Sequence, residues 1–331
     1  NIADHLGLSR NTVSKALKNS SEVSENTRNL VIKTASKLGY KNATFATPVI
    51  PASETGSNGT ILFLTRTYAS DSEFWTTVLR GIESILSNAN YHLAISIMSD
   101  SDLKQLNFPQ TISDSSIKGI ILVEICDKVV CDALSQFNLP IVSVDMPNVP
   151  FEELNGIDVV TMESKKNLKK IINQLIEKGA ESFGFVGDLY SPNVSRGFQE
   201  RYNALSECLA EHQLPLNQKN CLLHQTPEDF RNFQTTVNNL QAMISLPDVF
   251  ICGNDWTAIQ LIYALQFLGF QIPKDICVVG FDNIPAASRI SPSLTTISTP
   301  QKYLGIAAAR QILERIQHPN CPHVFCQYET E

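Results

Sequence analysis

The chain has 331 residues, 43% of them hydrophobic and 18% charged, a composition that predicts two or three globular units and excludes a disordered chain. Taken whole, the formal net charge of −7 argues against a nucleic-acid partner, because phosphate binding needs a positive surface. The charge is unevenly distributed, however. Residues 1–42 carry seven Lys or Arg against three acidic residues, for +4, and the remainder carries −11. A short basic head on a long acidic body is typical of a DNA-facing module joined to a larger domain.

The head has the pattern of three short helices. Residues 2–6 form a short amphipathic segment, and Gly7 suits a C-cap because glycine adopts positive φ readily. Ser9 is placed to cap a second helix over residues 9–17, and a third helix is predicted from residue 24 to residue 40. Helix, glycine turn and helix at this spacing predict an all-α helix-turn-helix head.

Residues 43–59 differ in kind from the head. They are rich in Pro, Gly, Ser and Thr, with Pro48 and Pro51 in the middle of the segment. This composition predicts a linker or hinge rather than part of a packed domain.

From residue 60 onward, short apolar strands alternate with amphipathic segments of helix length. Nearly continuous apolar strands separated by helices predict parallel sheets covered on both faces. About 270 residues exceed what one such sheet needs, so we predict two α/β subdomains with doubly wound parallel sheets, divided near residues 156–161. The predicted strands are 61–64, 92–97, 119–123, 141–144, 182–186, 220–224, 249–252 and 276–279. The predicted helices are 75–87, 167–178, 200–211, 231–244 and 257–268.

Motifs for catalysis, cofactors and metals are missing from the sequence. It contains no nucleophile elbow, phosphate-binding glycine loop or paired-carboxylate motif, and its six histidines are dispersed. Its eight cysteines form no CxxC pair, which predicts buried thiols in a reducing cytoplasm. No segment reads as an export signal or membrane span, and because the chain does not begin with Met we expect a few preceding residues. We therefore expect no enzymatic activity, no cofactor, no metal and no membrane contact.

Several short motifs occur in a fixed order along the chain. The head contains LGLSRNTVSKALKN at 6–19, VSENTR at 23–28 and LGY at 38–40. The body contains EFWTTVLRGI at 73–82, KGIIL at 118–122, PIVSVD at 140–145, GND at 253–255, VVGFDNIP at 278–285 and PSLTTI at 292–297. In this order the motifs closely resemble those of the lactose-repressor (LacI/GalR) family of transcription regulators. The resemblance implies a periplasmic-binding-protein-like body with interleaved subdomains, 60–158 with 291–317 and 159–290 with 318–331.

The resemblance also implies roles for residues of the head. Arg10, Asn11 and Lys15 match the family's base-reading positions, and Arg, Lys and Asn are the side chains that pair with guanine and adenine in the major groove. The positions that match phosphate contacts are Ser9, Thr12, Ser14, Lys18, Ser24 and Thr27. The alternative is that all of these are ordinary solvated residues of a surface helix.

The linker departs from the family pattern. Members usually follow Leu-Gly-Tyr with a short helix that folds on operator DNA and inserts a Leu into the minor groove. Here Pro48 disfavours a helix interior, and Thr47 replaces an Arg. A shortened helix with Val49 or Phe45 as the wedge remains an alternative to an unfolded hinge.

In the body, the resemblance implies a ligand cleft beyond the carboxyl ends of the strands. Tyr68, Phe74 and Trp75 offer aromatic faces for a sugar ring or a nucleobase, with core packing as their alternative. Arg201 matches the family's effector-binding arginine, and the neighbouring Arg196 competes for that role.

Three acceptors complete the predicted effector site. Asn254 and Asp255 follow one strand and Asp282 follows another, so their oxygens are placed to bind the hydroxyl groups of a polyol. Their alternatives are capping of the next helix for Asn254 or Asp255 and closure of an Asx turn for Asp282.

These features together predict a sequence-specific DNA-binding regulator, a repressor of carbohydrate-utilisation genes controlled by a sugar or sugar phosphate in the cleft. One head contacts only a half-site, so we expect a homodimer on a pseudo-palindromic operator in the bacterial cytoplasm, at the nucleoid. The alternatives are a nucleobase or a partner protein as the effector, or a binding module without a DNA function.

Overall fold

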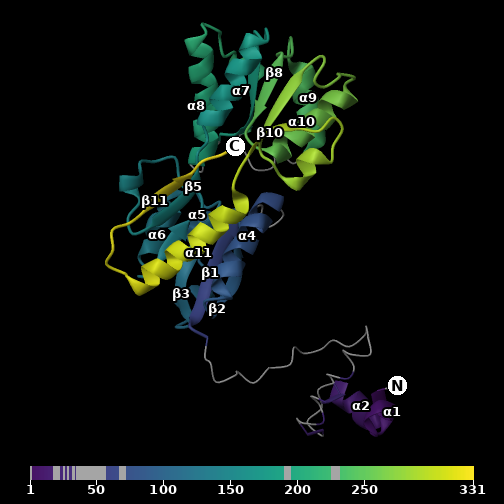
Figure 1. Ribbon diagram of the computed structural model, residues 1–331, viewed down its shortest axis with the longest axis vertical. Helices are drawn as coiled ribbons and strands as arrows, with labels where there is room; N and C mark the ends of the chain where they lie inside the picture. The colour runs from purple at the N-terminus through teal and green to yellow at the C-terminus, as the bar shows by residue number, and fades with distance from the viewer. Residues whose placement is uncertain are drawn as a thin grey trace. The chain divides into compact units, whose positions relative to one another are not determined.

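We describe the protein from a computed structural model, which covers residues 2–17, 23, 24, 27, 30, 31, 34, 57–66, 72–189, 195–224 and 232–331 (Figure 1). The chain divides into a small unit, residues 1–56, and a large unit, residues 57–331. We refer to them as the head and the body and treat each by itself. The predicted hinge over residues 43–59 lies outside the described residues except for its last three.

The head contains α1 (Ile2–Leu6) and α2 (Arg10–Leu17), which pack around a small apolar core. The predicted caps are confirmed: Gly7 has a φ of +63°, and the Ser9 hydroxyl accepts a hydrogen bond from the Thr12 amide at 3.0 Å. The buried core residues are Ile2, Ala3, Val13, Ala16, Val23 and Val31. Most of the predicted third helix lies outside the described residues, although its described positions 27, 30, 31 and 34 are helical.

The body contains two parallel sheets, as predicted (Figure 1). The first has the strand order β11-β5-β4-β3-β1-β2 and the second the order β10-β9-β8-β6-β7. The strands of the first sheet are β1 (Gly59–Arg66), β2 (Tyr91–Met98), β3 (Ile117–Val123), β4 (Ile141–Ser143), β5 (Asp158–Met162) and β11 (Phe325–Tyr328). Those of the second sheet are β6 (Phe183–Asp188), β7 (Leu222–His224), β8 (Val249–Cys252), β9 (Cys277–Asp282) and β10 (Thr295–Ser298).

Helices cover both faces of each sheet, which explains why the strands are apolar on both sides. In β1, Ile61 and Phe63 pack under α4 and α11, whereas Leu62 and Leu64 pack under α5 and α6. In the second sheet, α7 and α8 cover one face and α9 and α10 the other. The helices are α4 (Glu73–Leu86), α5 (Asp100–Gln105), α6 (Lys128–Ser135), α7 (Lys166–Glu177), α8 (Arg196–Glu211), α9 (Phe233–Ala242), α10 (Asp255–Phe267) and α11 (Gln301–Gln317). Short 3-10 turns occupy Gln110–Ser113, Phe151–Glu153, Gln218–Asn220 and Pro285–Ser288.

Glycine allows α4 and α11 to cross at very short distance. A Cβ on Gly305 would lie 2.0 Å from the Val78 carbonyl oxygen, and one on Gly81 would lie 2.2 Å from the Lys302 carbonyl oxygen. The two helices therefore meet backbone to backbone, and α11 is tied to the first sheet although it follows β10 of the second sheet.

The sheets divide the chain differently from the predicted subdomain ranges. Residues 158–162, where a break was expected, form strand β5 of the first sheet, and β11 joins the same sheet beside it. Conversely, β10 belongs to the second sheet, although 291–317 was assigned to the first subdomain. The error has a physical source: β5 begins with a charged residue two positions after Gly156, whose φ is +75°, so the segment has the sequence of a turn. The helix α11 does belong to the first subdomain, as expected.

The chain passes between the two sheets three times, at residues 163–165, 299–300 and 329–330. At the third passage, the backbone of Glu331 exchanges two hydrogen bonds with that of Ser298. None of the helices among the described residues has the length and apolarity needed to span a bilayer.

Candidate ligand cavity and DNA-facing helix

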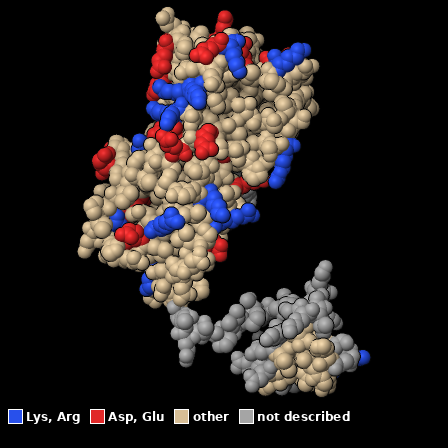
Figure 2. Space-filling view, viewed as in Figure 1, with Lys and Arg blue, Asp and Glu red and all other residues tan. Residues whose placement is uncertain are grey.

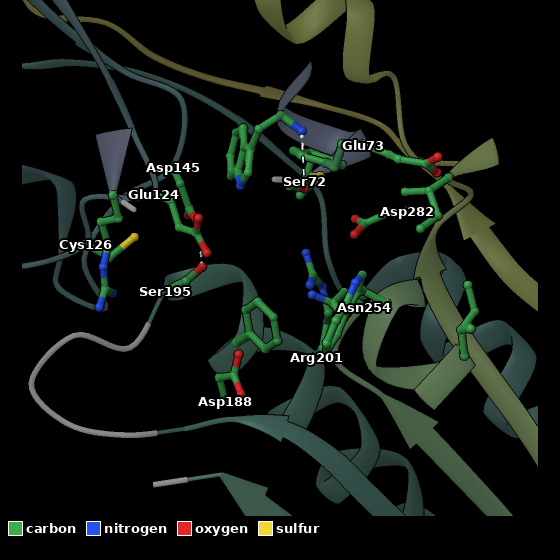
Figure 3. Close-up of a pocket in the computed structure, with 18 of the residues that line it drawn as sticks. Ser72, Glu73, Glu124, Cys126, Asp145, Asp188, Ser195, Arg201, Asn254 and Asp282 are labelled. Atoms are coloured by element: carbon green, nitrogen blue, oxygen red, sulfur yellow. Dashed lines mark hydrogen bonds between the residues drawn. The ribbon is translucent and has the colours of Figure 1, made fainter. Parts of the chain in front are cut away.

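A cavity of about 620 Å³ lies in the body, where the carboxyl ends of strands from both sheets face each other (Figure 3). From the first-sheet side it is lined by Arg66, Ser72, Glu73, Phe74, Trp75, Glu124, Cys126, Asp145 and Met162. From the second-sheet side it is lined by Asp188, Ser195, Phe198, Arg201, Asn254, Trp256, Ile259, Gln260, Asp282, Ile284 and Ala286. Its volume suits a ligand the size of a sugar or a nucleoside.

The start of α4 supplies the aromatic side of the cavity. Ser72 caps this helix by accepting a hydrogen bond from the Trp75 amide at 3.4 Å. The rings of Phe74 and Trp75 meet edge to face at 4.6 Å. Phe74 is only 6% exposed and contributes to the core as well, so the half-buried Trp75 offers the larger surface to a ligand.

Arg201 on α8 is the buried cation of the second-sheet wall. It is 2% exposed, and its Nη1 donates to the Gly253 carbonyl oxygen at 2.5 Å. Its guanidinium lies 3.8 Å above the Phe281 ring and 5.1 Å from the Phe198 ring. Burial lowers the pKa of Arg201, and its Nε has no hydrogen-bond partner among the described residues.

Carboxylates stand on both sides of the cavity. Figure 3 shows Glu124 and Asp145 together on one side, Asp282 on the other, and Arg201 between them. Burial raises the pKa of Asp282 well above its ordinary value, and it raises that of Asp145 against the opposing hydrogen bond from Ser195 Oγ at 2.7 Å. Burial also raises the pKa of Glu124 to about 7.

Two hydrogen bonds join the two subdomains across the cavity. The Glu73 carboxylate accepts a hydrogen bond from the Ala286 amide at 3.2 Å, and Ser195 donates to Asp145. A ligand that enters between these walls therefore changes the surroundings of contacts that hold the two subdomains together.

The predicted effector residues are brought together in part. Phe74, Trp75, Arg201, Asn254 and Asp282 all line the cavity. Asn254 also caps α10, because its Oδ1 accepts a hydrogen bond from the Thr257 amide at 2.9 Å. The predicted Tyr68 lies outside the described residues.

The expectation for Asp255 was wrong. This residue is fully buried outside the cavity lining, and its carboxylate accepts hydrogen bonds from the Ile284 amide at 2.9 Å and from the Thr296 hydroxyl. It fixes the loop after β9 to β10, which is a structural role. Arg196, the competitor of Arg201, pairs with Glu200 at 2.8 Å and also lies outside the lining.

The sequence interpretation missed five charged residues of the cavity, Arg66, Glu73, Glu124, Asp145 and Asp188. Arg66 and Asp188 end a strand, and Glu124 and Asp145 follow one within two residues, at the edge where parallel sheets bind ligands, whereas Glu73 begins α4. That signal was available in the sequence, because charged residues after the apolar runs ending at positions 64, 123, 144 and 186 stand out.

In the head, α2 presents its polar face to solvent. Arg10, Asn11 and Ser14 are exposed and Lys15 is half-buried, while Lys18 lies outside the described residues. The hydroxyls predicted to bind phosphate serve locally as caps. The pairs Ser9–Thr12 and Ser24–Thr27 each share a hydroxyl hydrogen bond of 2.8 Å. Among the described residues, no group of three His, Cys, Asp or Glu side chains is arranged to hold a metal ion.

Comparison with known proteins finds a matching family model in each of the two units. The family model described as bacterial regulatory proteins, lacI family, matches residues 1–42, and that of the periplasmic binding protein-like domain matches residues 172–325. The ribose operon repressor of Haemophilus influenzae is 27% identical over 323 residues, which cover 96% of this chain and 92% of that protein.

Two solved structures share the fold. A LacI family transcriptional regulator from Enterococcus faecium with bound ribose has a TM-score of 0.66 at 24% identity, over 82% of this chain and 96% of that one. The lac repressor dimer bound to operator and the anti-inducer ONPF has a TM-score of 0.68 at 19% identity, over 100% of this chain and 95% of that one.

Proposed function

The chain belongs to the LacI family of bacterial regulatory proteins, and from this premise we propose that it represses transcription from operator DNA under the control of a small polyhydroxylated ligand. The observation that carries the proposal is the presence, in one chain, of an exposed polar recognition helix and a cavity lined by Arg201, Asp282 and aromatic rings. We propose binding and regulation in the cytoplasm, without catalysis, as the whole of its activity.

The head is the unit that recognises the DNA sequence. Arg10 and Asn11, in the first turn of α2, and Lys15 one turn later are the side chains that face base edges when such a helix enters the major groove. The body is unsuited to phosphate, because it carries −10. On the face in Figure 2, its basic side chains occur in small groups among acidic ones.

A dimer with two-fold symmetry can place one head on each half-site of a pseudo-palindromic operator. The body offers apolar surface for it on two elements. The edge strand β2 exposes Ile95 and Ile97 by 54% and 49%, and α10 exposes Tyr263 and Phe267 by 44% and 68%. We propose that each of these two surfaces packs against the same surface of a second chain in a homodimer. The lac repressor bound to operator is also a dimer.

The ligand acts through the closure of the two subdomains. Contacts such as Glu73–Ala286 and Ser195–Asp145 cross the cavity, so a ligand that binds one degree of closure better shifts the population toward it. A coupling of about 1–3 kcal/mol changes operator affinity by roughly 5–150-fold.

The DNA role is tested by selecting operators from random duplexes with the full chain and measuring affinities by fluorescence anisotropy. We expect Lys15→Ala to lose discrimination at one base-pair position by about 1–3 kcal/mol. Lys166→Ala, on an exposed ion pair of the body, is the matched control and keeps the selected preference. If Lys15→Ala weakened binding equally on every sequence, a base-reading role for Lys15 would be excluded.

The ligand role is tested in the same assay with added sugars. Arg201→Leu is expected to bind operator as the wild type does but to lose the response to a sugar, because the buried guanidinium that faces the ligand is gone. Arg289→Leu changes an exposed arginine of the same subdomain outside the cavity and keeps the response. A full response in Arg201→Leu would contradict the cavity as the effector site.

A further inference from the structure

The described part of the cavity lining has more carboxyl groups than guanidinium groups. Two guanidinium groups face five carboxylates, which are Glu73, Glu124, Asp145, Asp188 and Asp282. In a site partly shielded from water, such an excess favours a cation and opposes an anion more strongly than on an open surface. The charged groups of the lining therefore restrict the charge of the ligand that can bind.

Both arginines already have partners within the protein. Arg66 is 6% exposed, and its Nη2 pairs with Asp100 at 2.7 Å, outside the lining. Arg201 donates to the Gly253 carbonyl oxygen and stacks on the Phe281 ring. Part of the positive charge of each group is therefore directed to the protein, and a phosphate would also meet the carboxylates of the lining.

Glu124 is a carboxylate with little support from the protein. It follows the last residue of β3, and its buried Oε2 has no hydrogen-bond partner among the described residues. A hydrogen bond from Trp75 and the charge of Arg66 favour its ionised form, but burial and the charges of Asp145 and Asp188 oppose that form more strongly. Glu124 also lines the cavity, so a ligand donor that reaches its carboxylate offsets the cost of the missing hydrogen bond.

We propose that the cavity selects a cationic polyhydroxylated ligand, such as an amine-bearing sugar or sugar alcohol, whose ammonium group binds Glu124 beside Asp145 and Asp188, and that it rejects sugar phosphates. An ammonium supplies three N–H donors to this acidic wall. The indole of Trp75, which hydrogen-bonds to Glu124, also lines the cavity. Asn254 and Asp282, on the second-sheet side, remain for hydroxyl groups.

The proposal gives the site a pH dependence. Glu124 is faced by Arg66 from β1, by Asp145 after β4, by Asp188 from β6 and by Cys126 on its own loop. A ligand cation lowers the pKa of Glu124 and displaces its proton, so binding of a permanently cationic ligand tightens as pH rises from about 6 to about 8.

The proposal rests on the proposed function and is tested on the full chain with probes matched in shape. One set is 6-amino-6-deoxyglucose, glucose and glucose 6-phosphate, and another is glucamine, sorbitol and sorbitol 1-phosphate. We expect the amine of at least one set to raise the melting temperature and, by calorimetry, to bind at least about tenfold more tightly than its neutral partner at pH 8. We expect the phosphates not to bind. Equal or tighter binding of a neutral member, binding of a phosphate, or no binding by either amine overturns the proposal.

Variants separate the charge effect from folding. Glu124→Gln keeps the shape of the side chain and is expected to abolish the preference for the amine, and Asp188→Asn to reduce it. Glu83→Gln, on the exposed side of α4, should leave it unchanged. A full preference retained in folded Glu124→Gln contradicts the assignment of Glu124. If operator selection succeeds but glucose or its phosphate controls it, the proposed function holds and this inference fails. If the amine binds but no operator is selected, the proposed function fails alone.

Discussion

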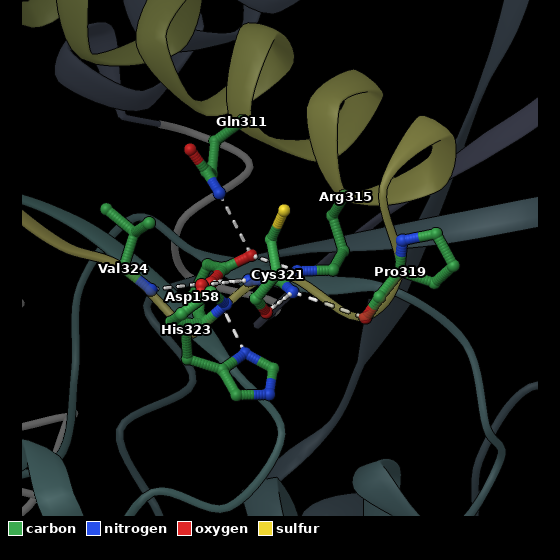
Figure 4. A network of polar contacts seen from close by, with 8 residues as sticks. Asp158, Gln311, Arg315, Pro319, Cys321, His323 and Val324 are labelled. Carbon is green, nitrogen blue, oxygen red and sulfur yellow. Dashed lines mark hydrogen bonds and ion pairs between the residues drawn. The ribbon is translucent and has the colours of Figure 1, made fainter.

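The body contains two clusters of buried charge that differ in how well their groups are satisfied. In the first, Asp158 of β5 pairs with Arg315 of α11 (Figure 4). Every N–H of the Arg315 guanidinium has an acceptor, either Asp158 or a carbonyl oxygen of Pro319, Cys321 or Pro322. In the cavity cluster, by contrast, Arg201 Nε and Glu124 Oε2 have no hydrogen-bond partner among the described residues.

The difference shows in the pKa of the two carboxylates. Burial acts to raise the pKa of Asp158, but the hydrogen bonds from Arg315, the Val324 amide and Gln311 hold it below its ordinary value. Burial raises the pKa of Glu124 to about 7, because too little opposes it. A buried charge whose partners all come from the protein fixes the fold, here by joining β5, α11 and the segment before β11. A buried charge left short of partners is available to a ligand.

The largest effect is expected from breaking the satisfied cluster. Arg315→Leu leaves the fully buried Asp158 carboxylate without its two strongest donors and leaves three carbonyl oxygens unpaired. We expect a loss of about 3–5 kcal/mol in the free energy of unfolding, measured by urea denaturation at pH 7. Lys166→Ala, which breaks the exposed pair with Glu329, is the control and should cause no measurable loss. A loss in Arg315→Leu no larger than in the control would show that Asp158 reaches water or other donors.

A substitution of Glu124 in the cavity is expected to change the free energy of unfolding by a smaller amount and in the opposite direction. The Glu124 carboxyl has a folded pKa of about 7 against an ordinary 4.5, so its contribution to stability is present below pH 4.5 and is lost as pH rises to 7. Glu124→Gln should therefore be more stable than wild type at pH 8 and closer to it at pH 5. One pKa unit corresponds to about 1.4 kcal/mol, and partial exposure reduces the amount, so we expect a gain of about 1–2 kcal/mol.

Urea denaturation of both proteins at the two pH values measures this gain. Glu83→Gln is the control for loss of a surface carboxylate. A Glu124→Gln variant that is less stable than wild type at pH 8 would mean that the ionised carboxylate is satisfied by the protein. The cavity would then resemble the Asp158 cluster rather than differ from it.

The sequence predicted the fold better than the division of the chain. Alternation of apolar strands and amphipathic helices indicated two parallel sheets, and each of the eight predicted strands exists. Which sheet a strand joins was harder to predict, because β5, β10 and β11 are parallel strands whose partners lie up to 166 residues away in sequence, as for Phe325 and Val159. Local pattern contains no information on such pairing.

The site was predictable at the positions that a family motif marks and less so elsewhere. Arg201, Asn254 and Asp282 were found in this way, whereas Glu124 and Asp188 required attention to the residue that ends or follows a strand. Asp255 was misassigned because capping, tertiary hydrogen bonding and ligand contact use the same acceptor atoms. Only the positions of Ile284 and Thr296, 29 and 41 residues away in sequence, reveal which of these applies.

The smallest change in the free energy of unfolding should come from removing a single further donor to Asp158 in the Asp158–Arg315 cluster. Gln311 on α11 donates to Asp158 Oδ2 at 3.1 Å, while the same oxygen accepts from Arg315 Nε at 2.9 Å. In Gln311→Leu the carboxylate keeps its charge partner, so we expect a loss of only about 1 kcal/mol in the free energy of unfolding. Gln317→Leu, at the exposed end of the same helix, is the matched control in urea denaturation at pH 7. If Gln311→Leu cost as much as Arg315→Leu, the cluster would depend on each donor. Its contrast with the cavity would then lie in rigidity rather than in the number of partners.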